Sequence, residues 1–254
     1  MSEFRGSKKA QKATLPQKIG PPVNPKPAAQ PSRVVLRGTS VTLVPLSPDH
    51  AADLFEAVGG EEKRALWTYM GDGPYLSRSE FEDAIVTKSK SEDPLFFAII
   101  STETQKPIGY STLMRIDAKS RSVEVGNIMF SPLLQRTKSA TEAMYLLAYY
   151  AFVDLGYRRY EWKCDNLNGP SKRAALRFGF TFEGIFRQHM IYKGRNRDTA
   201  WFSVIDTEWP VVQRAFEAWL HDTNFDEQGR QKCKLEDLRD ALQNQRGPVI
   251  LKTE

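Results

Sequence analysis

Two periods of hydrophobic and polar positions divide the chain into expected strands and expected helices. Runs rich in β-branched and aromatic residues, bounded by turn residues, predict strands. These runs cover 34–46 with a Gly-containing bend, 95–101, 107–115, 122–130, 158–165, 182–192 and 200–206. Apolar residues at helical spacing, with start or stop signals, predict helices over 47–58, 61–69, 79–88, 135–157, 168–180, 209–220 and 235–243.

The strongest helical pattern follows the expected strand at 122–130. Its apolar residues recur at i, i+4, i+7 and i+8, so they form one buried face and belong to the core rather than to a ligand site. They are Ala140, Met144, Leu147, Ala148, Ala151, Phe152 and Leu155. Helix starts are also marked at Ser47-Pro48-Asp49 and at Ser79, where Glu82 completes a capping box.

A basic, hydroxyl-rich loop leads into that apolar helix. Its sequence is Gln-Arg-Thr-Lys-Ser-Ala at 135–140. A helix start presents free backbone N–H groups and the positive end of the helix dipole, which together favour a phosphate group. The first hypothesis is therefore a site for a phosphate-bearing cofactor.

Further features stand in a fixed order around this loop. A Glu-Val-Gly strand at 124–126 precedes it, Thr-Glu-Ala at 141–143 follows it, and Asn-x-x-Ser at 168–171 comes before Gly-Phe at 179–180. In this order and spacing they resemble the GCN5-related N-acetyltransferase (GNAT) superfamily, in the branch similar to ribosomal-protein N-terminal acetyltransferases. The resemblance implies an α+β fold, with a mixed, mostly antiparallel sheet, splayed parallel central strands and helices on both faces.

The resemblance also implies acetyl-CoA as co-substrate. The backbone of Ile128, Met129 and Phe130 would line the pantetheine, and Asn168 and Ser171 would contact it near the sulfur. The pyrophosphate would be held by the loop and helix start, which comprise Gln135, Arg136, Thr137, Lys138, Ser139, Ala140 and Thr141. Lys138 and Ala140 replace glycines usual in the family, so we expect the hydroxyls of Thr137 and Ser139 and the charges of Arg136 and Lys138 to compensate.

Amine acetylation needs a base for the amine and a proton donor for the departing thiolate. The resemblance suggests Glu124 as the base, although a carboxylate on a strand can also simply pair with a basic neighbour. Many family members carry a tyrosine acid at the position of Ala175, so the acid here would be Ser171, a water or no protein group. Asn168 and Ser171 could equally serve as helix-start residues. Cys164 has no activating histidine motif and reads as a buried structural cysteine.

Aromatic and polar residues outside the cofactor block could form an acceptor pocket. Trp67, Tyr69 and Tyr75 could wall it, Asp72 could hold a cationic group, and His189 could bind the acceptor or act as an alternative base. These side chains could also simply cover the core. The acceptor is then a small-molecule amine or, alternatively, a peptide N-terminus. A third alternative, from another class, is a CoA-binding or ribosome-associated module without catalysis.

Charge and composition divide the chain into three parts. The net charge is +5, but residues 1–33 contain seven lysines and arginines and one glutamate, so the rest of the chain is slightly acidic. We therefore expect a disordered, basic, Pro-rich arm at 1–32, an acetyltransferase domain at 33–220 and a polar, partly helical extension at 221–254. Nucleic acid is not an expected partner except through the arm.

The remaining composition argues against several classes of protein. There is no apolar run of membrane-span length and no leader pattern, and Cys164 and Cys233 are far apart, so we expect a cytoplasmic protein without a disulfide scaffold or a membrane partner. His50, His189 and His221 are scattered, so no metal is expected. The sequence carries no signal for an oligomeric state.

Overall fold

The computed structural model describes residues 17–244 and contains one eight-stranded sheet. The strand order is β1-β2-β3-β4-β5-β6-β8-β7. The strands are β1 (Leu36–Arg37), β2 (Val41–Pro45), β3 (Leu95–Ser101), β4 (Pro107–Asp117), β5 (Ser122–Phe130), β6 (Arg159–Asp165), β7 (Thr181–Tyr192) and β8 (Arg195–Ile205). Only β5 and β6 pair in parallel, so the expected mixed, mostly antiparallel sheet is confirmed.

The two parallel strands separate partway along their length. Their register runs from Ser122 opposite Arg159 to Val125 opposite Trp162, and β6 continues beyond that point paired only with β8. Asn127 has a left-handed backbone (φ 46°), and the pairing of β5 with β4 shifts register around it. Such a bulge bends the strand, which explains how β5 leaves β6 while remaining in the sheet.

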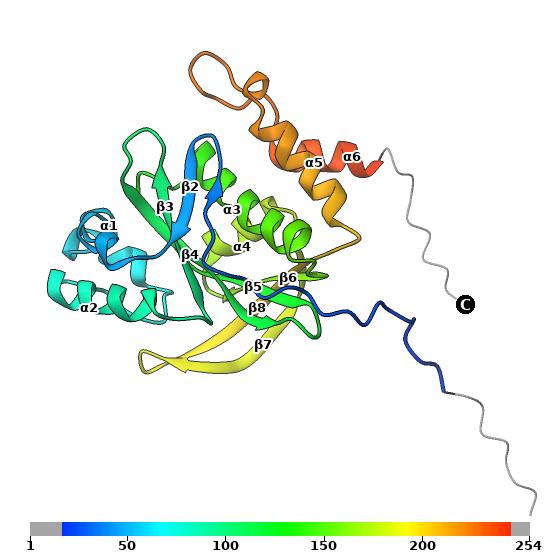
Figure 1. Ribbon diagram of the computed structural model, residues 1–254, viewed down its shortest axis with the longest axis horizontal. Helices are drawn as coiled ribbons and strands as arrows, with labels where there is room; N and C mark the ends of the chain where they lie inside the picture. The colour runs from blue at the N-terminus through cyan, green and yellow to red at the C-terminus, as the bar shows by residue number, and fades with distance from the viewer. Residues whose placement is uncertain (1–16, 245–254) are drawn as a thin grey trace, which may run out of the picture.

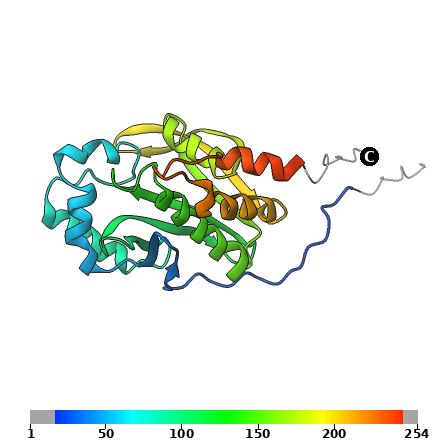
Figure 2. The ribbon, with the colours of Figure 1, turned by 90° about the horizontal axis from the view of Figure 1, so that it is seen from above.

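Helices cover both faces of the sheet. One group comprises the 3₁₀ turn η1 (Pro48–His50), α1 (Ala51–Val58), the 3₁₀ helix η2 (Glu61–Trp67) and α2 (Arg78–Ser89). The other comprises α3 (Lys138–Tyr149), the π-helical turn η3 (Tyr150–Asp154), α4 (Gly169–Arg177), α5 (Trp209–Leu220), η4 (Asp222–Asn224) and α6 (Leu235–Asn244). Figures 1 and 2 show α1 and α2 at one end of the molecule and α3, α5 and α6 together toward the other.

Two apolar clusters match these two groups of helices. Leu54, Trp67 and Phe81 pack with Tyr110 and Met129 beneath α1 and α2. The larger cluster lies under α3 and α5 and includes the amphipathic face predicted for 140–155. That prediction is confirmed, because all seven of its apolar residues are buried. The first group covers only β2 to β5, so the same face of β6, β8 and β7 carries polar side chains instead of a helix.

The hairpin β7–β8 corrects one expectation. The expected strands were 182–192 and 200–206, which left a long turn between them, but only Lys193 and Gly194 form the turn, and β8 already begins at Arg195. Both turn residues have positive φ (48° and 70°), as in a two-residue type I′ turn, whose twist matches that of paired strands. Cross-strand pairing, such as Ile191 with Asn196, therefore overrides the polar composition.

A second correction concerns the start of α2. Ser79 and Glu82 were expected to form a capping box, but the N-cap residue is Ser77 and its side chain makes no capping bond. Instead, the Ser77 and Ser79 hydroxyls lie 2.8 Å apart and Glu82 accepts a 2.8 Å bond from Arg78. The Glu82 carboxylate, which a capping box would require, is thus engaged in an i,i+4 ion pair with Arg78.

Segments outside the central region also contact it. The amides of Ala28 and Ala29 donate to the carbonyls of Ala118 and Leu155 at 2.9 Å, and Ser32 N–H donates to the Tyr150 hydroxyl. The arm expected at 1–32 is thus attached at its end, whereas residues 1–16 lie outside the described part. In the expected 221–254 extension, α6 docks through buried Leu235, and residues 245–254 are likewise outside the description.

No helix between residues 17 and 244 combines the length and the apolar character needed to cross a bilayer.

Candidate functional site

The gap between β5 and β6 provides an unpaired strand edge. Ile128, Met129 and Phe130 lie beyond the last β5–β6 pair, while Met129 and Phe130 pair with β4 on their other side. The free edge of a strand offers N–H and C=O groups to any extended polar molecule. The amide of a pantetheine arm has this character, so these three residues fit the role expected of them. The Gln135 side chain donates to the Phe130 carbonyl (2.9 Å) and closes the end of the edge.

Neither residue at the positions of the missing glycines needs a glycine-like backbone. Lys138 and Ala140 lie within α3, and the left-handed conformation in this loop falls on Arg136 (φ 63°). Thr137 is the N-cap: its hydroxyl accepts from Ala140 N–H at 3.1 Å and donates to the Leu134 carbonyl at 2.6 Å. The first helical N–H groups, of Lys138 and Ser139, have no partner within the helix and lie at its open end. The Thr137 hydroxyl is therefore engaged in hydrogen bonds within the loop, while the backbone N–H groups at the helix start can still face an anion.

The basic residues at the helix start have different surroundings. Arg136 is exposed. The Lys138 ammonium instead pairs with Asp222 at 2.7 Å and lies 4.8 Å from the centre of the Phe225 ring. Thr141 is buried, and its hydroxyl accepts from Arg177 at 3.0 Å. Of the charges expected to compensate for the missing glycines, only that of Arg136 has no side-chain partner among the described residues.

Glu124 lies on the polar face of the sheet, beside the gap. It is 5% exposed, and its Oε2 forms ion pairs with Arg115 Nε at 3.0 Å and Lys163 Nζ at 2.9 Å. Burial raises the pKa of Glu124 above its ordinary value, against the opposing effect of the two cations. The expectation that this carboxylate might pair with a basic neighbour is thus met. Both ion pairs use Oε2. The other oxygen, Oε1, lies 3.5 Å from the position that a Cβ would take on Gly126.

Asn168 and Ser171 form the start of α4 on the other side of the gap. Asn168 Oδ1 accepts from Ser171 N–H at 3.1 Å, which is the capping role that the sequence also allowed. The Ser171 hydroxyl accepts from Trp162 Nε1 at 3.0 Å, so its own proton can be donated to the nearby Cys164 sulfur or to a bound molecule. Cys164 is buried nearby, and burial raises the pKa of its thiol, which suits an unreactive structural cysteine.

Three of the residues expected to form the acceptor pocket lie together: the ring centres of Trp67 and Tyr75 are 5.0 Å apart, and the Tyr75 hydroxyl contacts Asp72. Trp67 is 1% exposed, and its Nε1 donates to the Val58 carbonyl at 2.8 Å, so it belongs to the core. Asp72 accepts from the Tyr75 hydroxyl at 2.9 Å and pairs with Lys88. Of this group, only the Tyr69 hydroxyl reaches toward the gap, where it donates to the Leu167 carbonyl at 3.2 Å.

His189 lies on β7, on the polar face of the sheet. Its Nδ1 is 2.9 Å from the Thr199 hydroxyl, and its ring centre is 6.0 Å from that of Trp201. Partial burial lowers the pKa of His189, and the nearby cations Arg115, Arg197 and Lys163 act in the same direction. The imidazole therefore tends to stay neutral, as a proton acceptor requires.

The sequence did not reveal several residues of this face. Lys163 is buried between Glu124 and Glu161, and Tyr192 donates to Asp165 at 2.8 Å at the end of β6. The alternation of Glu161, Lys163 and Asp165 along the strand was the available signal, because residues two apart lie on one face of a strand. What the sequence lacked was the register that sets Lys163 beside Glu124.

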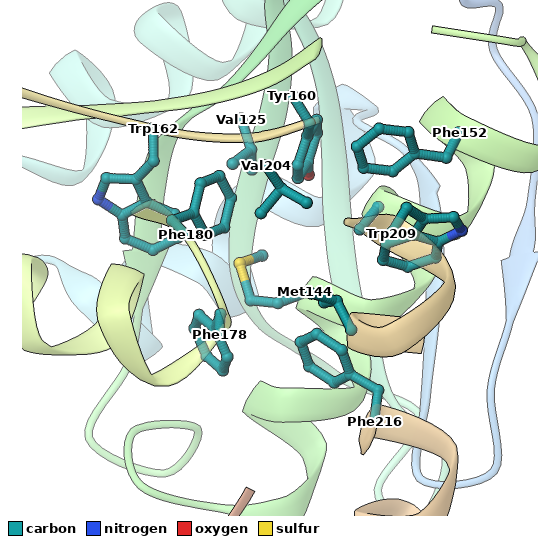
Figure 3. A pocket seen from close by; sticks show the side chains of 12 residues that line it. Val125, Met144, Phe152, Tyr160, Trp162, Phe178, Phe180, Val204, Trp209 and Phe216 are labelled. Atoms are coloured by element: carbon teal, nitrogen blue, oxygen red, sulfur yellow. The ribbon is translucent and has the colours of Figure 1, made fainter. Parts of the chain in front are cut away.

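An internal cavity lies on the opposite side of the sheet, under α3 and α5. Figure 3 shows Met144 between Val204, Phe178 and Phe216 in its lining. Its volume is only about 10 Å³, and its lining exposes no polar surface to it. A space of roughly one water molecule with apolar walls stays dry and reflects imperfect packing rather than a substrate site.

Comparison with known proteins identifies the family. The family described as "Acetyltransferase (GNAT) domain" matches residues 40–181. A GCN5-related N-acetyltransferase from Brucella melitensis has a similar crystal structure (TM-score 0.83, 50% identity), covering 85% of this chain and 98% of that one. A putative ribosomal-protein-serine acetyltransferase from Vibrio cholerae shares the fold (TM-score 0.59, 22% identity, 68% of this chain and 97% of that one).

A relative of known sequence gives the same result. The protein named "Uncharacterized N-acetyltransferase p20", from Bacillus licheniformis, is 31% identical over 144 residues, which are 56% of this chain and 80% of that protein. The match of a family domain to more than half of the chain, together with a closely similar structure, leads to one conclusion. The chain belongs to the GNAT family and is an acetyltransferase.

Proposed function

We propose that this enzyme transfers the acetyl group of acetyl-CoA to the primary amine of a small molecule, by direct attack in a ternary complex. The observation that carries the proposal is the gap between β5 and β6, with a buried carboxylate on one side and a helix start on the other. Acetyl-CoA, when bound, supplies the thioester. Its pantetheine would run along Ile128, Met129 and Phe130, and its pyrophosphate would meet the start of α3.

Glu124 would accept the proton of the attacking amine. A base must be ionised to act, and the ion pairs with Arg115 and Lys163 favour the ionised form and so oppose the burial that raises the pKa of Glu124. Ser171 would donate a proton to the departing thiolate, because its hydroxyl oxygen already accepts from Trp162 and its hydrogen can turn from the Cys164 sulfur to the cofactor. Burial of Glu124 keeps water away from the carboxylate and strengthens its electrostatic effect on the reaction.

Two contacts at the open end of the gap favour a small acceptor. Tyr69 joins the loop after η2 to the Leu167 carbonyl, and the Lys193 ammonium of the β7–β8 hairpin donates to the Trp67 carbonyl at 2.8 Å. These contacts link three segments across the polar face and narrow the approach. A long groove for a polypeptide would need this side open.

A peptide N-terminus is the second candidate, and one observation favours it. The edge strand β7 exposes Ile185, Phe186 and Ile191 beside the polar face. Exposed apolar side chains of this kind can seat a polypeptide. The structural relative from Vibrio cholerae is named for a ribosomal protein as acceptor, but at 22% identity that likeness concerns the fold.

A panel experiment separates these candidates from a non-catalytic CoA-binding module. The protein would be mixed with acetyl-CoA and, in turn, with polyamines, aminoglycosides, amino acids and peptides, and thiol release would be followed in a single turnover. We expect release above the acetyl-CoA-only rate with a small amine. Release with peptides alone would favour the second candidate, and CoA binding without release for any amine would contradict both.

A further inference from the structure

The carboxylate of Glu124 is held by one oxygen only. Arg115 Nε and Lys163 Nζ both lie against Oε2, at 3.0 and 2.9 Å, and the angles are those of ion pairs rather than of aligned hydrogen bonds. Among the described residues no hydrogen bond reaches Oε1. That oxygen lies 3.5 Å from the position that a Cβ would take on Gly126, a position that the flexible side chain of Met114 also approaches, with its sulfur at 2.4 Å.

The two cations that hold Oε2 differ in their surroundings. The Arg115 side chain is 49% exposed, so solvent weakens its pull. The Lys163 side chain is 4% exposed and is fixed on three sides, by Glu124, by Glu161 Oε2 at 2.6 Å and by the Trp201 ring 3.8 Å from its Nζ. A buried cation with a cation–π contact is the firmer anchor.

We propose that Lys163 is a positioning residue, which grips Oε2 of Glu124 so that Oε1 faces the acceptor amine and takes its proton. The inference rests on the proposed function, in which Glu124 is the base. Lys163 does not touch the reacting atoms. It fixes the direction of the carboxylate and, as a neighbouring charge, its state of ionisation.

The other charges around Glu124 make this role testable. Arg115 faces it from β4 and Lys163 and Glu161 from β6, while His189 on β7 and Arg197 on β8 lie farther out on the same face. Lys163 and Arg115 lower the pKa of Glu124, and Glu161 raises it. Glu161 is itself tied to Arg159 at 2.6 Å, and Arg159 to Glu183. Lys163 and Glu161 thus belong to one network of ion pairs. Removing Lys163 takes away a positive charge near Glu124, whereas removing Glu161 takes away a negative one.

The experiment compares Lys163→Met with Glu161→Gln. For each variant, kcat/KM and kcat would be measured across about pH 6 to pH 9 with the best amine from the panel above. The Glu124 carboxyl would also be titrated by ¹³C NMR, and the Glu124→Gln variant would serve to assign its signal. In Lys163→Met we expect the midpoint of the titration and the acid limb of the rate profile to move to higher pH. In Glu161→Gln both should move to lower pH.

A positioning role for Lys163 predicts a second effect, a loss of rate that is separate from the shift of the Glu124 titration. At high pH, where the carboxylate is ionised even in Lys163→Met, kcat should remain roughly tenfold or more below that of the parent, because a misdirected base is costly. The loss in Glu161→Gln should be smaller. Lys163→Arg keeps a cation against Oε2 and should recover part of the rate. CoA affinity, measured by calorimetry, should be unchanged throughout.

The outcomes distinguish a failure of the role proposed for Lys163 from a failure of Glu124 as the base. Shifts of the same sign in Lys163→Met and Glu161→Gln, or a high-pH kcat in Lys163→Met within about twofold of the parent, would overturn the role of Lys163. If Glu124→Gln turns over normally, the base assignment fails instead, and the NMR titration still reports on the ion pair. Should Lys163→Met not fold, an unmoved carboxyl titration in Glu161→Gln overturns the inference by itself.

Discussion

Lys138, the first residue of α3, forms an ion pair with Asp222, in the turn that follows α5, at 2.7 Å. The pair connects the proposed pyrophosphate loop to the C-terminal part of the chain. The Asp222 side chain is almost fully exposed, and pairs of this kind contribute little to stability. In the proposed site, a bound pyrophosphate would therefore compete with Asp222 for the Lys138 ammonium.

This relationship predicts opposite effects of neighbouring substitutions on CoA binding. Arg136→Ala combined with Lys138→Ala should weaken CoA binding by roughly 1–3 kcal/mol, the range for lost charge-assisted hydrogen bonds. Asp222→Asn is the matched control, and it should leave affinity equal or tighter because Lys138 is released. Calorimetry at low and high salt measures both. Unchanged affinity in a folded double variant would remove the loop from the cofactor site.

The N-terminal segment should matter for stability only where it touches the domain. Deleting residues 1–27 should leave the thermal midpoint unchanged, because residues 17–27 are almost entirely exposed and belong to no helix or strand. Deleting residues 1–32 also removes the bonds of Ala28, Ala29 and Ser32. At about 1 kcal/mol each, these should lower the midpoint by several degrees. Equal midpoints for the two truncations, measured by calorimetric scanning, would show that these contacts are not made in solution.

The two cysteines should differ sharply in reactivity. Cys233 is exposed, whereas Cys164 is buried with a raised thiol pKa. In the folded protein a thiol reagent at neutral pH should modify one cysteine quickly, and Cys233→Ser should abolish that fast phase. Cys164→Ala should acetylate amines at near the parent rate if the protein remains folded. A fast phase that survives Cys233→Ser would mean that Cys164 is accessible and reopen a role for it in chemistry.

Gly126 should be needed for the acceptor and not for the cofactor. An alanine there would place a methyl group 3.5 Å from Glu124 Oε1 and 2.4 Å from the sulfur of Met114, whose side chain must then move. Gly126→Ala should lower kcat/KM for the amine while CoA affinity persists. Steady-state kinetics with both substrates tests this. Gly156→Ala, at a glycine remote from the gap whose positive φ (77°) makes an alanine strained, shows the effect of general destabilisation alone. Parallel losses in amine and CoA binding would instead indicate general damage to β5.

Local patterns predicted the bounds of some strands and missed those of others. β3 and β5 have the predicted bounds, because a dense run of β-forming residues is closed by turn residues at each end. β8 was expected to start at Ala200, since Arg195 to Asp198 reads as polar loop. Its true start depends on pairing with β7, which is tertiary information.

Prediction of the site residues was limited in the same way, because contacts between distant segments cannot be read from local patterns. The loop at 135–140 could be proposed from the sequence because its basic and hydroxyl residues are contiguous. Lys163 was missed because its partner Glu124 lies on a different strand, and the parallel register that joins them leaves no trace in either segment. Trp67 was placed in the acceptor pocket on residue type alone. Only the bond from its indole to the Val58 carbonyl shows that it belongs to the core.

The most direct test of the account is the Glu124→Gln variant, which keeps the size of the side chain and removes its basicity. A base of this kind contributes about 10²–10⁴-fold, so turnover should fall by roughly two decades or more while CoA affinity stays the same. The loss should shrink as pH rises, because more of the amine is then already neutral. A Gln variant that turns over at near the parent rate between about pH 6 and pH 9 would contradict the account and make His189 or a water chain the leading candidate for the base.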